Sequence, residues 1–317
     1  MASLSHNAPQ PQGMPIPDAL NLGLVVAVSS LSIGLLWAAS RLERPYAVLG
    51  VGMVFSYVLL TNYALLHEAA HDNLSSNPRV NYLLGVTAGA LFPVAFSMVR
   101  ATHQGHHLRN RTDYEMFDLY YPTDNLFKKY LQWYGTLCGL FWPWIPIGAL
   151  LFALCPPLLR VPAVRNAKTA SYLVGDVRGA EVRRIRLEAV LVVALFLALF
   201  RVLDLRWQAV LALYACFAFN WSTRQYVGHA FSRRDVVEGA WNLRHSRWMN
   251  WVLLYGNWDL NHHRNPGVPW LYLPSLPDGG GAQPRYIAQY RRMWRGPRPA
   301  TEPAPESLTE LPLSIHR

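Results

Sequence analysis

The chain has 317 residues, of which 52% are hydrophobic and only 15% are charged, and its formal net charge is +10. Soluble domains carry about 25% charged residues, so this composition argues against an ordinary soluble domain. The basic residues flank apolar runs and no nucleic-acid motif is present, which favours a lipid surface over nucleic acid as the partner. The three cysteines lie in apolar stretches outside any CxxC, so we expect no disulfide or thiolate metal site.

The N-terminal part of the chain predicts a transmembrane hairpin. Residues 1–18 are polar and proline-rich, which indicates a flexible tail. Residues 19–39 and 46–66 contain no charged residue, and each is long enough to cross a hydrocarbon core of about 30 Å. A short charged turn separates them, and the second span ends directly before His67.

Two later apolar stretches are interrupted by proline. Residues 81–99 contain Pro93, and residues 131–155 contain Pro143 and Pro146. Proline bends or ends a helix because it lacks the backbone N–H and clashes with the preceding turn. We therefore expect both stretches to be re-entrant or interfacial and to leave the membrane on the face they entered.

A second hairpin is predicted further along the chain, with spans at residues 187–203 and 207–226. The basic segment 160–186 before it favours the cytoplasmic side. The expected fold is an all-α integral membrane protein with four transmembrane helices in two hairpins, two re-entrant or interfacial segments and a cytoplasmic histidine-rich cap. The membrane-embedded domain covers residues 19–275, and the Pro/Gly-rich residues 276–317 are expected to be a disordered tail.

Eight of the eleven histidines fall into four groups, each just after a long apolar segment. The groups are His67 and His71; His103, His106 and His107; His229; and His262 and His263. Imidazole is the commonest metal-binding side chain at neutral pH, and residues spaced by three or four share one face of a helix. Eight imidazoles are too many for one tetrahedral zinc and suit two metal ions that share a site.

Ligation by nitrogen without thiolates suits iron, zinc or copper, and added carboxylates favour iron or manganese. Six carboxylates lie near the histidines, and we expect most of them to orient imidazole N–H groups. They are Glu68, Asp72, Asp113, Glu115, Asp118 and Asp259.

The order HxxxH, HxxHH, a lone His and a final HH resembles the membrane-bound fatty acid desaturase-like enzymes, a superfamily that includes acyl and sphingolipid desaturases, carotenoid ketolases and hydroxylases. The resemblance covers roughly residues 45–275, and His67/His71 and His103/His106/His107 match the first two motifs in full. The last motif departs from the family's HxxHH, because Asp259 stands where its first histidine is expected. Asp259 is therefore expected to be a ninth ligand or a partner of one.

The resemblance implies a non-haem di-iron site on the cytoplasmic face of a multi-pass membrane protein, in a bacterial inner membrane or its equivalent. It implies that the eight histidines hold two irons, and that dioxygen and two electrons oxidise a C–H bond of a fatty acyl or related lipid chain. Segments around Phe92, Phe96, Trp133 and Trp142 would shape an apolar tunnel for that chain. Because no haem, flavin or iron–sulfur motif is present, we expect an external electron donor of the ferredoxin or cytochrome b5 type with its reductase.

Desaturation is the expected outcome, with hydroxylation, ketone formation or decarboxylation to a terminal alkene as alternatives on the same scaffold.

Two rival functions remain open at this stage. His67 to His71 also read H-E-x-x-H, the signature of zinc proteases in which Glu68 would be the general base. An intramembrane metalloprotease would leave most of the other histidines without a role. A metal transporter would carry ligands inside its spans, whereas here they follow the spans.

Overall fold

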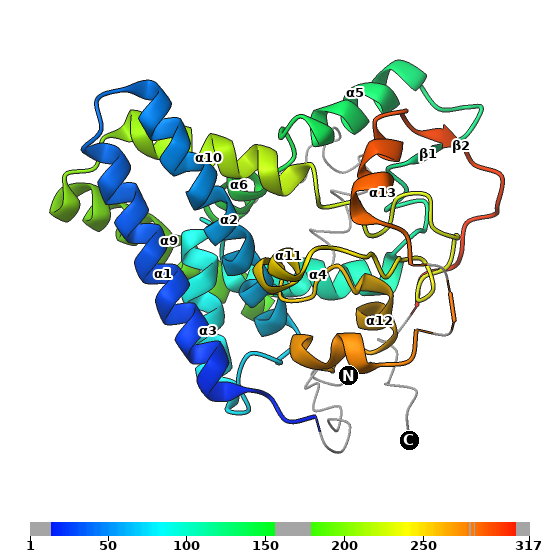
Figure 1. Ribbon diagram of the computed structural model, residues 1–317, viewed down its shortest axis with the longest axis horizontal. Coiled ribbons are helices and arrows are strands. Elements are labelled where there is room, and N and C mark those ends of the chain that lie inside the picture. Colours follow the sequence, from blue (N-terminus) through cyan, green and yellow to red (C-terminus); the bar gives the residue numbers. More distant parts are fainter. Residues whose placement is uncertain (1–13, 156–178, 279, 282, 309–317) are drawn as a thin grey trace.

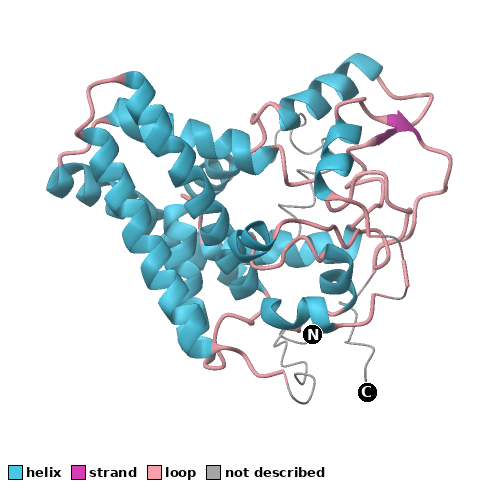
Figure 2. Cartoon of the chain, in the orientation of Figure 1, coloured by secondary structure: helices cyan, strands magenta, loops and turns pink. Residues whose placement is uncertain are grey.

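The computed structural model describes residues 14–155, 179–278, 280–281 and 283–308. The regular secondary structure of the described residues is almost entirely helical, with loops between the helices (Figure 2). Its helices are α1 (Asp18–Ser40), α2 (Pro45–Ala70), α3 (Pro78–Leu91), α4 (Phe96–Arg109), α5 (Leu126–Leu137), α6 (Trp144–Leu154), α9 (Gly179–Leu203), α10 (Trp207–Ser222), α11 (Arg247–Val252), α12 (Asp259–Arg264), the 3-10 helix η2 (Trp270–Ser275) and α13 (Tyr286–Met293). Two short strands, β1 (Leu119–Tyr120) and β2 (Arg298–Pro299), pair in parallel.

The first hairpin forms as its uncharged runs predict. Pro45 starts α2 at a position where its missing N–H costs nothing, and α2 packs against both α1 and α10 (Figure 1). Gly52 allows the close approach to α10, because a β-carbon there would come within 2.8 Å of Cys216 Sγ. By length and composition, α1 and α2 are the two described helices that can each cross a membrane.

Residues 81–99 bend as the proline indicates. The bend separates α3 from α4, whose axes differ in direction by 97°, and the pair is either one broken span or a re-entrant loop. Asn77 begins α3 by accepting hydrogen bonds from the N–H groups of Arg79 and Val80. After the bend, α4 carries His103, His106 and His107.

The second predicted hairpin corresponds to α9 and α10. Arg41, after α1, pairs with Asp204 in the turn between α9 and α10 at 3.1 Å, which ties the end of α1 to that turn. The structure supports a mostly helical protein with two membrane-spanning helices, or three if the bent pair is counted. The predicted spans at residues 187–203 and 207–226 stay predictions, as does the side of the membrane on which the histidines lie. The expected flexible tail and basic segment fall largely on residues 1–13 and 156–178, outside the described residues.

The chain after residue 276 differs from the expected disordered tail. Residues 286–293 form α13, and β2 pairs with β1 at Leu119 and Tyr120. Met293 is fully buried, and its carbonyl accepts the indole N–H of Trp133 at 2.9 Å. The proline- and glycine-rich composition concealed an amphipathic helix, and burial of its apolar face is what orders the segment.

Candidate metal centre

Four histidine side chains from α2, α4 and α12 meet at one point. They are His67, His71, His103 and His262, and their ligating nitrogens all lie within 4.8 Å of one another. Nε2 of His71 lies 2.7 Å from Nε2 of His103. Since a metal–nitrogen bond is about 2.1 Å long, nitrogens this close fit around one ion.

A second group lies beside the first and consists of His106, His229 and His263, again with ligating nitrogens within 4.8 Å. The Asp259 carboxylate joins it, with Oδ2 at 3.1 Å from Nε2 of His229 and Oδ1 at 3.9 Å from Nε2 of His263. This second group therefore offers three imidazoles and one carboxylate.

His107 lies between the two groups. Its Nε2 is 3.2 Å from Nε2 of His103 and 3.0 Å from Nε2 of His262, while its ring centroid is 4.4 Å from that of His263. The structure thus brings all eight predicted histidines and Asp259 into one double cluster. Their roles as metal ligands remain a prediction.

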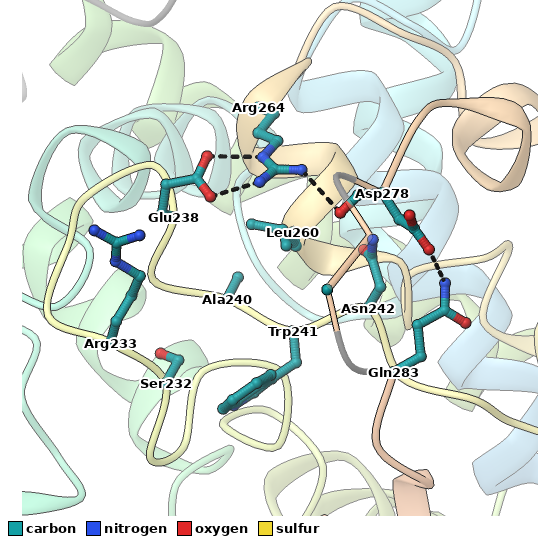
Figure 3. A pocket seen from close by; sticks show the side chains of 11 residues that line it. Ser232, Arg233, Glu238, Ala240, Trp241, Asn242, Leu260, Arg264, Asp278 and Gln283 are labelled. Carbon is teal, nitrogen blue, oxygen red and sulfur yellow. Dashed lines mark hydrogen bonds and ion pairs between the residues drawn. The ribbon is translucent and has the colours of Figure 1, made fainter.

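Helical spacing explains how so few segments supply so many rings. The pair His67/His71 comes from the last turn and the C-cap of α2, and the set His103/His106/His107 projects from one face of α4. The short helix α12 delivers the two adjacent histidines, His262 to the first group and His263 to the second. Its C-terminal end is fixed by Arg264, which donates two hydrogen bonds to the Glu238 carboxylate at 2.7 and 2.6 Å (Figure 3).

His229 comes from the loop after α10, and its ring is oriented by a backbone group. Nδ1–H of His229 donates to the carbonyl of Gly239 at 3.1 Å, which leaves Nε2 free to face the cluster. Gly239 has no room for a side chain, because a β-carbon would collide with the Asp235 carbonyl and with Arg111. Gly228 is similarly restricted, since a β-carbon there would overlap the Asp259 carboxylate.

A buried ion pair holds the same loop. The Arg111 guanidinium donates to Asp118 at 2.5 Å, to the Tyr226 hydroxyl at 2.8 Å and to the Ser232 carbonyl at 3.0 Å. Asp118 also accepts the backbone N–H of Phe231 at 2.5 Å. Arg111 and Asp118 are essentially inaccessible to solvent, so each depends on the other for compensation of its charge.

The other predicted carboxylates separate into two kinds. Glu115 contacts Nδ1 of His106 and is the expected orienting group for that ring. Glu68 is buried and accepts the backbone N–H of Trp270 at 3.0 Å, with its other oxygen 3.5 Å from Nδ1 of His67. Asp72 forms an ion pair with Arg100, and Asp113 forms one with Arg234.

Most rings of the cluster have a lowered pKa, which suits a cation, while at His106 the Glu115 carboxylate outweighs burial and raises the pKa. Burial, and then the neighbouring imidazoles, hold the pKa of His262 and His263 well below the ordinary value of 6.5. Burial also lowers the pKa of His229. These rings are therefore neutral at pH 7, which is the form that binds metal. Facing, buried nitrogen lone pairs are costly without a partner, so the residues present fit metal ions at the two groups.

Sequence reasoning missed the groups that set these positions. The spacing of the histidines does not predict the close approaches at Gly228 and Gly239 or the contact between Arg111 and Tyr226. All three depend on loops that fold back from distant parts of the chain. His245, outside the motifs, is also outside both groups: its ring lies 4.5 Å from that of Tyr286.

The aromatic residues expected around a substrate tunnel are packed against other rings. Phe92 contacts Trp142, Phe217 and Trp221 in the largest core cluster. Trp133 belongs to a different cluster, beneath α13. The tunnel stays a prediction.

The helical scaffold and the double histidine cluster define a mostly helical protein with candidate membrane spans and two adjacent candidate metal sites. The chain belongs to the fatty acid desaturase family: the family model described as "Fatty acid desaturase" matches residues 44–294, which include every residue of the cluster and α13. Membership implies an oxidoreductase of the fatty acid desaturase or hydroxylase type, associated with membranes and acting on lipid, and this family typically uses iron. A comparison with curated proteins finds no match.

Proposed function

We propose that this protein is a membrane-bound di-iron oxidase that desaturates a fatty acyl or related lipid chain. The observation that carries the proposal is the pairing of two histidine groups across α2, α4 and α12 inside a chain of the desaturase family. The overall reaction balances when an aliphatic –CH2–CH2– unit, dioxygen, two electrons and two protons give –CH=CH– and two waters.

The residues would divide between two irons. His67, His71, His103 and His262 would hold one, and His106, His229, His263 and Asp259 the other, with His107 between them. Two bound irons would supply the reductive activation of dioxygen that removal of hydrogen from an unactivated C–H bond requires.

The chain's own contribution is orientation. The Gly239 carbonyl holds the proton of His229 on Nδ1, and Glu115 does the same for His106, so that Nε2 of each ring faces the centre. Burial of the cluster limits the entry of water and lowers the pKa of His229, His262 and His263, which keeps those three rings neutral. The positions of His262 and His263 depend on α12, which Arg264 anchors.

We propose that the cluster lies on the cytoplasmic face of four spans, in a bacterial inner membrane or its equivalent. The concentration of arginine and lysine in residues 160–186 supports this orientation. Electrons would come from a ferredoxin or cytochrome b5 type donor with its reductase.

Hydroxylation, ketone formation and alkene-forming decarboxylation use the same type of centre, and product analysis separates them. The zinc protease has weaker support, because Glu68 accepts a hydrogen bond from Trp270 N–H, and because six of the eight clustered histidines lie outside the HExxH pair.

The direct test is turnover by the metal-loaded protein in lipid nanodiscs, supplied with fatty acyl substrates, dioxygen, reduced ferredoxin and ferredoxin reductase. We expect an unsaturated product by mass spectrometry, and none from His106→Ala. A hydroxylated, keto or shortened product would replace desaturation by one of the alternatives, while no oxidised product with any acyl substrate would contradict the proposal.

A further inference from the structure

A cavity of about 390 Å³ opens beside β2 and α13. Two guanidinium groups converge on one ring at its wall: Arg292 lies 4.9 Å and Arg298 4.4 Å from the ring centroid of Phe231. Figure 1 shows α13, β1 and β2 on the side of the molecule away from α1 and α9. The cavity therefore lies apart from the long apolar helices α1 and α9.

The two arginines carry positive charge that the described residues do not neutralise. Among the residues the structure describes, neither guanidinium forms an ion pair or a side-chain hydrogen bond. Glu302 also lines the cavity, but one of its carboxylate oxygens accepts the backbone N–H of Arg234 at 3.0 Å. The Arg234 side chain is itself paired with Asp113 at 2.9 Å.

A second cavity, about 210 Å³ in volume, differs because most of the charged side chains that line it have side-chain partners. Its lining includes Arg264, which is fully engaged with Glu238, and Asp278, which accepts from Gln283 at 2.8 Å (Figure 3). Side-chain pairs there hold α12 in place. In the cavity at Phe231 the charges of Arg292 and Arg298 remain available, and burial, followed by repulsion from Arg298, lowers the pKa of Arg292. An acidic partner would relieve that repulsion.

A chain of aromatic rings leads from this cavity to the second histidine group. The ring centroids of Phe231 and Trp133 are 6.1 Å apart, those of Trp133 and Tyr226 6.1 Å, and those of Tyr226 and His229 5.9 Å. A small bound anion would not need this connection. An electron-donor protein bound at the cavity would lie at one end of the row of rings, with the second histidine group at the other end.

We propose that the face formed by Arg292, Arg298 and Phe231 is the docking site of an acidic electron-donor protein, seated so that electrons enter beside His229. The inference rests on the proposed function, because an oxidation by dioxygen needs two external electrons and no haem, flavin or iron–sulfur motif lies in this chain. Two donor proteins, each oxidised by one electron, would supply one turnover.

The surroundings of the cavity fit a protein partner. Arg291, Arg295 and Trp294 lie exposed at the end of α13, beside Arg292. Arginine and tryptophan are enriched at the centres of protein–protein interfaces, and positive charge around them would speed the approach of an acidic protein.

The test uses the full-length metal-loaded protein in nanodiscs and an acidic plant-type [2Fe–2S] ferredoxin as the probe. We expect the double variant Arg292→Glu/Arg298→Glu to raise both the Kd for oxidised ferredoxin and the KM for reduced ferredoxin by about tenfold or more. The wild-type Kd should rise steeply with salt, and the variant should lose most of that dependence. Arg79→Glu, an exposed arginine at the start of α3, makes the same charge change elsewhere and should leave both constants unchanged.

Two controls distinguish a loss of docking from a loss of folding or of catalytic activity. Arg292→Gln/Arg298→Gln is a milder variant, and turnover driven by a chemical reductant should be the same in wild type and in both double variants. An unchanged Kd and KM for ferredoxin would overturn the inference. So would a selective rise in the KM of an anionic acyl substrate, or weaker binding to anionic vesicles with ferredoxin affinity intact. Arginine-dependent ferredoxin binding by a protein that oxidises no lipid would support the docking site and refute the desaturase, so the two failures are distinct.

Discussion

Oδ2 of Asp259 lies 3.1 Å from Nε2 of His229, although one residue starts α12 and the other lies in the loop after α10. The same carboxylate reaches toward His263 at 3.9 Å. A carboxylate at this point completes the second histidine group, in the position where the resemblance leads one to expect a histidine.

Removal of the Asp259 carboxylate should weaken the second site. We expect Asp259→Ala to lose about one iron per chain and nearly all turnover, because the site would then offer only three protein ligands. Asp259→His should keep iron and part of the activity, because an imidazole restores a ligand. Elemental analysis and product formation check both variants, and full iron content in Asp259→Ala would show that Asp259 is not a ligand.

A methyl group at Gly228 should act through Asp259. Because a β-carbon at position 228 would overlap the Asp259 carboxylate, we expect Gly228→Ala to reduce iron content and turnover almost as far as Asp259→Ala. Gly50→Ala is the matched control, since nothing lies within 4 Å of a β-carbon there. In that helix the exchange should stabilise the protein by about 0.5–1 kcal/mol. Wild-type iron content in Gly228→Ala would mean that the carboxylate can shift at no cost.

The buried ion pair of Arg111 and Asp118 should contribute more to the free energy of unfolding than an exposed ion pair does. We expect Asp118→Ala to destabilise the protein by about 3–5 kcal/mol, because it leaves the Arg111 charge buried without compensation. Tyr226→Phe removes only the hydroxyl and should cost about 1–3 kcal/mol. Thermal unfolding in nanodiscs measures both. Asp204→Asn breaks the exposed pair with Arg41 and should cost less than about 1 kcal/mol. Equal effects of Asp118→Ala and Asp204→Asn would contradict the burial argument.

A substitution at Glu68 distinguishes the oxidase hypothesis from the protease hypothesis. The glutamine in Glu68→Gln can still accept the N–H of Trp270, so we expect iron content to be kept and lipid oxidation to fall only a few-fold. A zinc protease would lose its general base and its activity entirely. Peptide cleavage by the wild type that disappears in Glu68→Gln would favour the protease.

The sequence was most informative where chemistry follows a helical period. The i, i+4 pair His67/His71 and the set on α4 could be predicted from spacing alone, and the uncharged runs predicted α1 and α2. The packing of α13 could not be, because its order comes from contacts between Met293 and the distant Trp133. Gly228 and Gly239 escaped for the same reason, since a glycine is needed only where another segment comes close.

The central claim is that the double histidine cluster holds two irons, and the metal content of the purified protein tests it most directly. Elemental analysis of the wild-type protein should give about two irons per chain and no stoichiometric zinc, with His106→Ala reduced. One zinc per chain and no iron would contradict the account.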